Sequence, residues 1–369
     1  MRGGASGLLR NLGFVATANA ERLQACAGNV FAAAGYRPVS PSVVTSADVF
    51  LDRLGERFRS QTLVIEDGRG ALLCLRPEMT IPAARIALDE GFRGGTCLKL
   101  SYAGSVFRLD GDGALHQAMQ AGIEHLGDVD AARADADVVA LAFQAVRACG
   151  VNEAVIRFSD LALFHALIAS LGLKPHQRAH VLRRFDAAGS AMFAFRTAFA
   201  PPAASRPLDP AQAQRLIGEG QLLCGVREAD EIACRLAERA SIADEGPIPP
   251  RAQDILAAFF ALSFEAGKAA DGIARFFEDH NLPAPDLASF NRRLTHLQAL
   301  SSALRFDARV HAPLGYYSGL EFRIEARGIN VAGGGRYDRL LPELLNDPSA
   351  NIPAVGAAIF LDALAEHGA

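Results

Sequence analysis

The stretch Leu75-Arg76-Pro77-Glu78-Met79-Thr80 decides how this sequence is interpreted. It begins at the end of a short apolar run over residues 72–75, and another short apolar run covers residues 63–65. The sequence Asp67-Gly68-Arg69-Gly70 lies between them, and two such runs around a turn of this composition predict a β-hairpin. The quoted stretch therefore continues directly from a predicted strand, and it adds one carboxylate and one hydroxyl group.

Strand and helix patterns surround this hairpin on both sides. Apolar residues that recur every three to four positions predict amphipathic helices, and short alternating or continuous apolar runs predict strands. Pro38 and Pro41 favour an extended segment ahead of the hairpin. In chain order we expect a helix at 20–31, then strands at 96–108 and 118–126 around a turn at 110–113. A helix at 131–149 and a strand at 154–158 follow. The next helix should be capped by Ser159 or Asp160.

The pattern changes between residues 175 and 303, where helical periodicity is interrupted repeatedly by proline. Residues 320–325 alternate strictly between apolar and polar, which predicts a strand with one buried and one exposed face. The apolar run 355–364 predicts a terminal helix. Strands that enclose helices in this way indicate an α+β domain formed by residues 1–174 and 304–369, with a helical insertion at 175–303.

Composition places the chain among globular proteins. Of its 369 residues, 50% are hydrophobic and 21% are charged, a balance that excludes a disordered chain. The formal net charge of −4 offers no general attraction for phosphate groups, which disfavours nucleic-acid binding. The sequence contains no uncharged apolar run of about 18 residues, so we expect no membrane span.

The cysteines show no pattern of a metal site. No two of them form a C-x-x-C pair, and no histidine accompanies them at zinc-finger spacing. We therefore expect reduced, mostly buried thiols in a cytoplasmic protein that binds neither a metal nor a cofactor. The residues concerned are Cys26, Cys74, Cys97, Cys149, Cys224 and Cys234.

Four segments, taken in order, resemble the catalytic domain of histidyl-tRNA synthetase, a class II aminoacyl-tRNA synthetase. The stretch at 75–85 differs from the family's L-R-P-E-G-T-A-P-x-A-R at only two defined positions, Met79 and Ile81. Any one segment could occur by chance, whereas four in order at family-like spacing are a strong signal. The other three are Gly35 to Pro41, which loosely resembles part of the dimerisation motif, Val106-Phe107-Arg108 to Gln120-Ala121-Gly122-Ile123-Glu124, and Tyr316-Tyr317-Ser318-Gly319 to Gly333-Gly334-Gly335-Arg336-Tyr337-Asp338.

The resemblance implies a class II synthetase-like antiparallel sheet flanked by helices, with a histidine pocket. Carboxylates in this pocket suit an ammonium group and an imidazole, while amide and hydroxyl groups supply directed hydrogen bonds. At the level of sequence other interpretations stay open: the glutamates as surface carboxylates, the tyrosines as strand packing, and glycines 333–335 as a turn or a close backbone approach. The residues assigned to histidine are Glu78, Thr80, Arg108, Gln120, Glu124, Tyr316 and Tyr317.

The resemblance fails where a synthetase holds ATP. Ala312 stands in place of the arginine of R-G-L-D-Y-Y, and Ala363 in place of the arginine of A-V-G-F-A-x-G-L-E-R-L. In that second motif Phe360 also replaces a glycine, and the loop at 109–113 is acidic where the synthetase is basic. Fixed cations stabilise the charge that develops during adenylation. We therefore expect no catalytic residues and no enzymatic activity.

The chain ends shortly after the second of these motifs, where a synthetase continues into an anticodon-binding domain, so we expect no such domain and no tRNA binding. Loss of ATP chemistry beside a retained amino-acid pocket resembles the ATP phosphoribosyltransferase regulatory subunits. That resemblance implies a homodimer that joins a short-form catalytic subunit in a hetero-oligomer, acts in the first step of L-histidine biosynthesis and responds to L-histidine. The alternatives are a truncated or divergent histidyl-tRNA synthetase-like ligase, and a histidine-sensing module for another partner.

Overall fold

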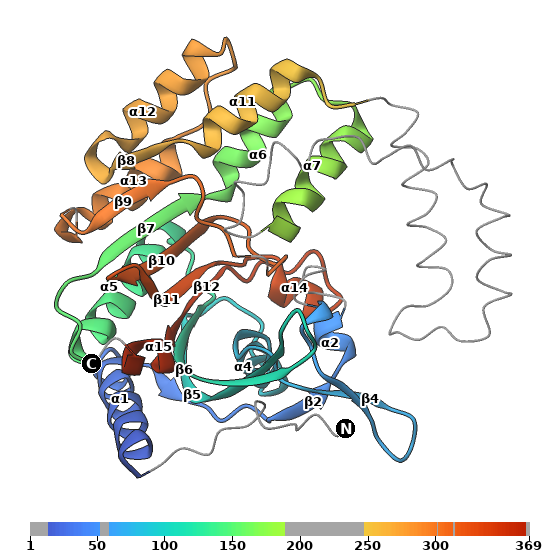
Figure 1. Cartoon of the computed structure of the whole chain (residues 1–369), viewed down its shortest axis with the longest axis vertical. Coiled ribbons are helices and arrows are strands. Elements are labelled where there is room, and N and C mark those ends of the chain that lie inside the picture. The colour runs from blue at the N-terminus through green and yellow to red at the C-terminus, as the bar shows by residue number, and fades with distance from the viewer. Residues whose placement is uncertain (1–13, 52–58, 189–246, 301, 313, 367–369) are drawn as a thin grey trace, which may run out of the picture.

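A nine-stranded sheet runs through the centre of the molecule (Figure 1). Its strands, in order across the sheet, are β1 (Arg37–Pro38), β5 (Leu98–Leu109), β6 (Leu115–Leu126), β12 (Ala354–Phe360), β11 (Ile329–Arg336), β10 (Leu320–Ala326), β7 (Val155–Asp160), β9 (Leu304–Asp307) and β8 (Ser263–Glu265). Two neighbouring pairs, β1 with β5 and β7 with β9, are parallel, and the others are antiparallel. The computed structural model describes residues 14–51, 59–188, 247–300, 302–312 and 314–366.

One face of the sheet is covered by the helices α1 (Phe14–Ala33), α5 (Ala131–Ala148) and α15 (Leu361–Glu366). As predicted, α5 buries one apolar stripe against the sheet, which includes the fully buried Val138 and Ala142. The side chain of Asp130 accepts a hydrogen bond from the backbone N–H of Arg133 and so caps α5. Ala121 and Ile123 of β6 belong to this core.

The other face of the sheet carries the predicted hairpin. Its strands β3 (Val64–Glu66) and β4 (Leu72–Leu75) pair with β2 (Val44–Ser46) in a small second sheet. Helix α4 (Thr80–Asp89) follows and packs on Leu100 and Leu126 of the large sheet, close to α14 (Leu340–Leu344), while α2 (Asp48–Leu51) lies in the same core. The hairpin prediction is confirmed, and the large sheet has helices on both faces.

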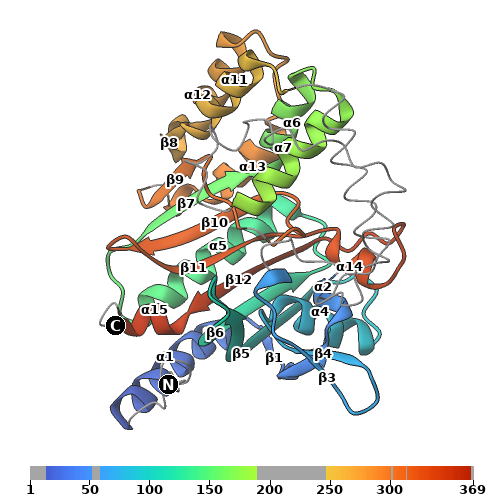
Figure 2. The same ribbon diagram turned by 45° about the vertical axis from the view of Figure 1, so that its right-hand side comes forward.

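The segment expected to be a helical insertion is mostly helical where the structure describes it. It also contains the short strand β8, which pairs with β9 at the edge of the large sheet. Figure 2 shows the helices that pack beyond this edge. The domain boundaries themselves stay a prediction. The described helices between β7 and β9 are α6 (Leu161–Ser170), α7 (Pro175–Ala188), α11 (Pro250–Phe260), α12 (Ala266–Asp279), α13 (Ala288–His296) and the 3-10 turn η2 (Gln298–Leu300).

A buried ion network joins this segment to the sheet. Arg293 of α13 donates to Asp135 of α5 at 2.7 Å and to Asp160 at 2.6 Å, and all three side chains are buried. Arg336 of β11 donates to the other oxygen of Asp135 at 2.8 Å. Asp160 also caps α6 by accepting from the N–H of Ala162, as one of the two capping alternatives predicted. Breaking such a buried pair leaves an uncompensated charge, so α13 is held firmly on α5.

Two predicted elements differ in the structure. Residues 354–360 form β12, between β6 and β11, and only residues 361–366 are helical, so a helix over 355–364 was wrong. A strand buried on both faces reads as a continuous apolar run, which periodicity cannot distinguish from a buried helix. The polar face of β10 is also covered, because Glu321 is only 1% exposed. Among the described residues, no helix is long and apolar enough to cross a membrane.

Candidate functional site

The predicted pocket residues gather on the sheet face that α4 covers. Glu124 of β6 pairs with Gly356 of β12, which in turn pairs with Gly335 of β11. A Cβ atom at Gly356 would overlap the Glu124 carboxylate, and one at Gly335 would lie 3.0 Å from the Tyr317 ring. Glycine at these positions therefore allows side chains to lie flat across the sheet, which confirms the close-approach interpretation of the glycine-rich segment.

Glu124 lies at the centre of the cluster and is fully buried. The hydroxyl of Tyr102 donates to its Oε1 at 2.9 Å, and the hydroxyl of Tyr337 donates to its Oε2. Burial raises the pKa of Glu124 to about 8, although the hydrogen bonds from Tyr337, Thr80 and Tyr102 oppose that shift. The carboxyl group therefore holds a proton at neutral pH, and it favours a ligand that brings a positive charge.

Glu78 accepts hydrogen bonds from the backbone at the start of α4. Its Oε2 accepts from the N–H of Thr80 at 2.7 Å and its Oε1 from the N–H of Ile81 at 2.9 Å, so it satisfies the first free N–H groups of the helix. Burial raises the pKa of Glu78 to about 6, while these backbone N–H groups and the Arg108 charge oppose that shift. The Tyr316 hydroxyl lies 3.5 Å from Oε2.

The structure brings most of the predicted residues together. Tyr317 shows this well, because burial and the carboxylates of Glu321, Glu124 and Glu78 all raise its pKa. Gln120 lies on the same face of β6 as Glu124, four residues away and opposite Phe360. Glu78 and Glu124 are 5% and 0% exposed, so their interpretation as surface carboxylates was wrong. Tyr316 and Tyr317 also pack in the adjoining core, as the packing interpretation expected, and a ligand role for them stays a prediction.

Arg108 extends from β5 towards the start of α4. Its Nε donates to the carbonyl oxygen of Pro77 at 2.8 Å, which holds the guanidinium beside the Glu78 carboxylate. Burial lowers the pKa of Arg108, while Glu78 and Tyr316 raise it. A guanidinium in this position offers hydrogen-bond donors that suit a carboxylate, next to acidic groups that suit a positive charge.

Three residues of the cluster were missed by the sequence analysis. Tyr337 lies in a segment that carried the family resemblance, so the sequence could have predicted it as a site residue. Tyr102 was hidden inside a predicted strand, and its role depends on the pairing of β5 with β6. Glu321 was assigned to an exposed face, although its Oε1 lies 2.9 Å from Nδ1 of His311.

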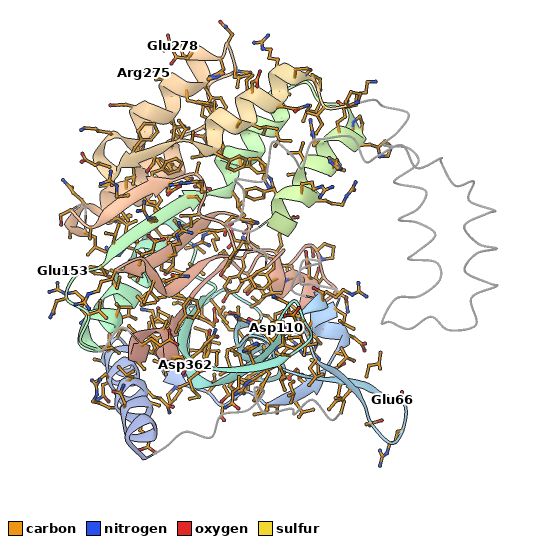
Figure 3. The ribbon with its side chains drawn as sticks, in the orientation of Figure 1. Glu66, Asp110, Glu153, Arg275, Glu278 and Asp362 are labelled. Carbon is orange, nitrogen blue, oxygen red and sulfur yellow. The ribbon has the colours of Figure 1, made fainter. Side chains whose placement is uncertain are left out.

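The positions that lack arginine are occupied by other contacts. Ala312 has no polar side chain, and its backbone N–H donates to Oε2 of Glu321 at 2.7 Å. At the other motif, the Phe360 ring comes within 4.0 Å of a Cβ atom built at Gly333, and Asp362 accepts from the N–H of Met119 at 2.8 Å (Figure 3). An aromatic ring and a methyl group therefore stand at the positions where the resemblance implies a glycine and an arginine, Phe360 and Ala363.

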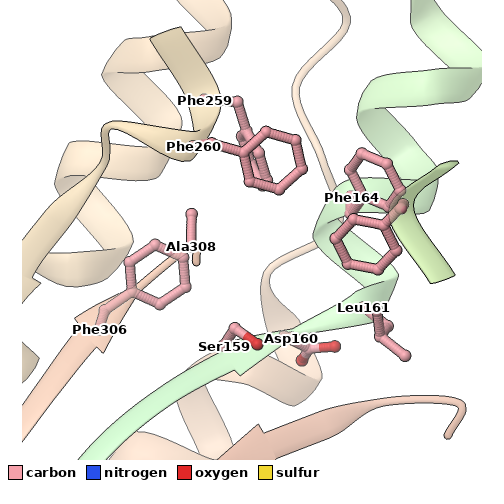
Figure 4. Close-up of a pocket in the computed structure, with 9 residues that line it drawn as sticks. Ser159, Asp160, Leu161, Phe164, Phe259, Phe260, Phe306 and Ala308 are labelled. Atoms are coloured by element: carbon pink, nitrogen blue, oxygen red, sulfur yellow. The ribbon is translucent and has the colours of Figure 1, made fainter. Parts of the chain in front are cut away.

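A small cavity is lined mainly by aromatic side chains (Figure 4). Its lining includes Phe164, Phe260 and Phe306, and its volume is about 10 Å³. That volume accommodates about one water molecule and no amino acid. None of the predicted pocket residues lines the cavity, so it is a packing feature between β7, α6 and α11.

The mainly antiparallel sheet and the buried carboxylate–tyrosine cluster define a class II aminoacyl-tRNA synthetase-like protein. The family model for histidyl-tRNA synthetase matches residues 9–205 and 232–364. A solved structure described as an ATP phosphoribosyltransferase regulatory subunit/histidyl-tRNA synthetase from Bacillus halodurans superposes with a TM-score of 0.70 at 19% identity, over 97% of this chain and 81% of that one. A histidine–tRNA ligase subunit from Alicyclobacillus acidocaldarius gives 0.63 at 23% identity, over 100% and 99%.

Curated relatives give the narrower assignment. A protein of Brucella anthropi is 36% identical over 350 residues, which cover 87% of this chain and 90% of the relative. One of Mesorhizobium japonicum is 33% identical over 368 residues, which cover 93% and 97%. Both are named ATP phosphoribosyltransferase regulatory subunit. The chain belongs to this family of regulatory subunits, as the sequence resemblance implied.

Proposed function

We propose that this chain binds a short-form ATP phosphoribosyltransferase catalytic subunit, is required for its activity in the first step of L-histidine biosynthesis, and catalyses no reaction itself. The observation that carries the proposal is the similarity over almost the whole length to relatives named as regulatory subunits. The site supports it, because Ala312, Phe360 and Ala363 replace the residues expected to serve adenylation. In this role the chain acts in the cytoplasm, as a homodimer within a hetero-oligomer, without tRNA, membrane or cofactor.

L-Histidine is the ligand that we propose for the carboxylate–tyrosine cluster. The buried carboxylates of Glu78, Glu124 and Glu321 favour a positively charged group, and Arg108 lies beside Glu78 for a ligand carboxylate. Histidine carries an ammonium group, a carboxylate and an imidazole that accepts a proton near neutral pH. Thr80 and Gln120 add a hydroxyl and an amide at the same face, and Tyr316 and Tyr317 form one side. This pocket would couple the regulatory subunit to the end product.

The regulatory proposal is tested by reconstitution. A purified short-form catalytic subunit is assayed for phosphoribosyl transfer to ATP with increasing amounts of this protein, and light scattering gives the mass of each protein and of the mixture. We expect this protein alone to be at least a dimer and the mixture to be larger than either component. Activity should rise with each addition until the catalytic subunit is saturated with this protein. A heat-denatured sample of this protein serves as the control. If the mass and activity of the catalytic subunit stay unchanged, the proposed partner is wrong.

A further inference from the structure

A cysteine, a histidine and an aspartate meet at one end of the β5–β6 pair, outside the carboxylate–tyrosine cluster. Cys97 directly precedes β5, His125 lies near the end of β6, and Asp128 lies in the turn that follows β6. The Cys97 Sγ and the Asp128 Oδ2 are each 3.1 Å from Nε2 of His125. All three atoms lie within 4.8 Å of one another. We propose that Cys97, His125 and Asp128 bind one divalent transition-metal ion of the zinc type.

The direction of the contacts favours a metal over a catalytic relay. In a nucleophile–histidine–carboxylate relay the nucleophile and the carboxylate contact opposite ring nitrogens. Here the thiol of Cys97 and the carboxylate of Asp128 face the same nitrogen of His125. Three donor atoms on one side of the imidazole, all within 4.8 Å of one another, are close enough to share an ion. When the ion binds, the bond from Sγ to the metal forms as the thiol proton leaves to solvent.

Outer contacts orient two of the three ligands. The Nδ1 of His125 lies 3.5 Å from the Tyr36 hydroxyl, which can accept a hydrogen bond from Nδ1–H and so leave the lone pair of Nε2 free for a metal ion. The Oδ1 of Asp128 accepts from the N–H of Asp130 at 3.0 Å, which leaves Oδ2 directed at the histidine. Metal-binding histidines commonly have such an outer partner on the second ring nitrogen.

The donor set and the spacing fit zinc. Zinc takes thiolate, imidazole and carboxylate ligands at about 2.0–2.3 Å in tetrahedral geometry, so its donor atoms are separated by roughly 3.3–3.6 Å. The two distances of 3.1 Å need to lengthen by only a few tenths of an ångström to match. Cys97 is exposed, which gives an ion access and leaves a fourth position for water. Lys99 and Asp137 are the further charged groups that act on His125, with opposite signs.

The contact of Cys97 with a histidine was not predicted from the sequence. No histidine accompanies Cys97 at zinc-finger spacing, and the spacing rules cover only nearby residues. Its partner is 28 positions away and is brought close by the antiparallel pairing of β5 with β6. A bound ion would join the beginning of β5 to the end of β6 and the following turn. It should therefore stabilise the folded protein, whether or not the protein regulates a partner.

Cobalt and zinc titrations of the whole, chelator-treated protein test this site. We expect one Co²⁺ per chain with a near-ultraviolet thiolate charge-transfer band, displacement by Zn²⁺, no effect of Mg²⁺, and a higher Tm with Zn²⁺. Loss of an outer contact to a metal ligand typically weakens metal binding by roughly 10- to 100-fold. Replacing a ligand itself should cost at least as much, so Cys97→Ser and Asp128→Asn should each weaken Zn²⁺ binding by roughly 10- to 100-fold or more.

Two comparisons keep this test decisive. Cys26→Ser removes another partly exposed thiol, one outside the cluster, and should leave binding unchanged. Circular dichroism of the metal-free variants shows that they fold, which is expected because Cys97 is exposed and Asp128 is half-buried. If the wild-type protein binds no stoichiometric Co²⁺ or Zn²⁺, or if Cys97→Ser binds both as the wild type does, the proposal is overturned.

Discussion

The hydroxyl group of Tyr102 on β5 donates a 2.9 Å hydrogen bond to Oε1 of Glu124 on the neighbouring strand β6. Tyr337 donates to the other oxygen, so both oxygens of this fully buried carboxyl group are occupied by tyrosines. These hydrogen bonds favour the charged form and lower the pKa of Glu124, but burial raises it more, to about 8, so the carboxyl group holds a proton at neutral pH. The hydrogen bonds also hold Glu124 in one orientation, ready for a ligand that replaces its proton by a positive charge.

Glu124→Gln should make the dependence of stability on pH weaker. The pKa of Glu124 is about 8 in the folded protein and near its ordinary value of 4.5 when unfolded. Between these values the folded state holds a proton that the unfolded state has lost, so this group stabilises the fold at low pH and loses that effect as pH rises towards 8. The variant should match the wild type near pH 4.5 and exceed it by a few kcal/mol at pH 8.5, at about 1.4 kcal/mol per pKa unit. Urea unfolding at several pH values measures the difference. A difference that does not change with pH would contradict the assigned pKa.

The same substitution should weaken histidine binding. Glu124→Gln keeps the shape of the side chain but cannot take the negative charge that an imidazolium requires. Hydrogen bonds to charged groups contribute about 1.5–3 kcal/mol, which corresponds to a roughly 10- to 150-fold higher Kd in calorimetry. Glu66→Gln, on the exposed hairpin (Figure 3), is the matched control and should bind as the wild type does. Equal affinity of both variants would place the histidine site elsewhere.

Histidine affinity should be greatest between about pH 6.5 and 8. In that interval the free imidazole has lost its proton, at about pH 6.5, and Glu124 still holds one, up to about pH 8. Binding then transfers the proton from the carboxyl group to the imidazole, and no proton is taken up from the solution or released to it. Below this interval Glu124 must release a proton, and above it the complex must take one up, so affinity should fall about tenfold per pH unit on each side. Calorimetry in buffers of different ionisation enthalpy measures the proton exchange. The same affinity at pH 5.5, 7.2 and 9 would exclude the proposed pairing.

Gly356→Ala should disrupt the cluster. A Cβ atom at this position would overlap the Glu124 carboxylate and lie 2.8 Å from the carbonyl oxygen of Ile123. Because these atoms belong to a central strand pair, the substitution should destabilise the protein by about 1–3 kcal/mol. Gly28→Ala is the control: its added Cβ meets nothing within 4 Å, and alanine in a helix interior should stabilise by up to about 1 kcal/mol. Thermal unfolding gives the Tm of each variant for comparison with the wild type. Similar Tm values would show that the strand moves to accommodate the methyl group.

The protein should not activate histidine with ATP. Ala312 and Ala363 carry no charge, and Phe360 lies over the strand where a phosphate would need donors. Pyrophosphate exchange with histidine and magnesium should remain at the background rate, while a histidyl-tRNA synthetase measured in parallel exchanges readily. Exchange on the order of 1 per second, typical of an enzyme, would instead support the ligase alternative.

Much of the local structure follows from the sequence. The polar turn at 67–70 and its flanking apolar runs predicted the β3–β4 hairpin, and the spacing of Val138 and Ala142 predicted the buried stripe of α5. These features depend on residues close together in the chain, whose periodicity reports directly which side is buried. The ordered motifs also identified the family and the buried glutamates, because each motif retains its own chemical pattern.

Long-range pairing decided the rest. Periodicity indicated that residues 354–360 are apolar, but only their position between β6 and β11 makes them a strand. Tyr102 and Tyr337 meet at Glu124, and Cys97 meets His125, because strands distant in sequence are hydrogen-bonded neighbours. The sequence by itself determined which chemical groups are present and which local elements carry them. The tertiary structure determined which groups share a buried site and what charge they hold there, because burial and neighbouring charges, which set a pKa, exist only after the chain has folded.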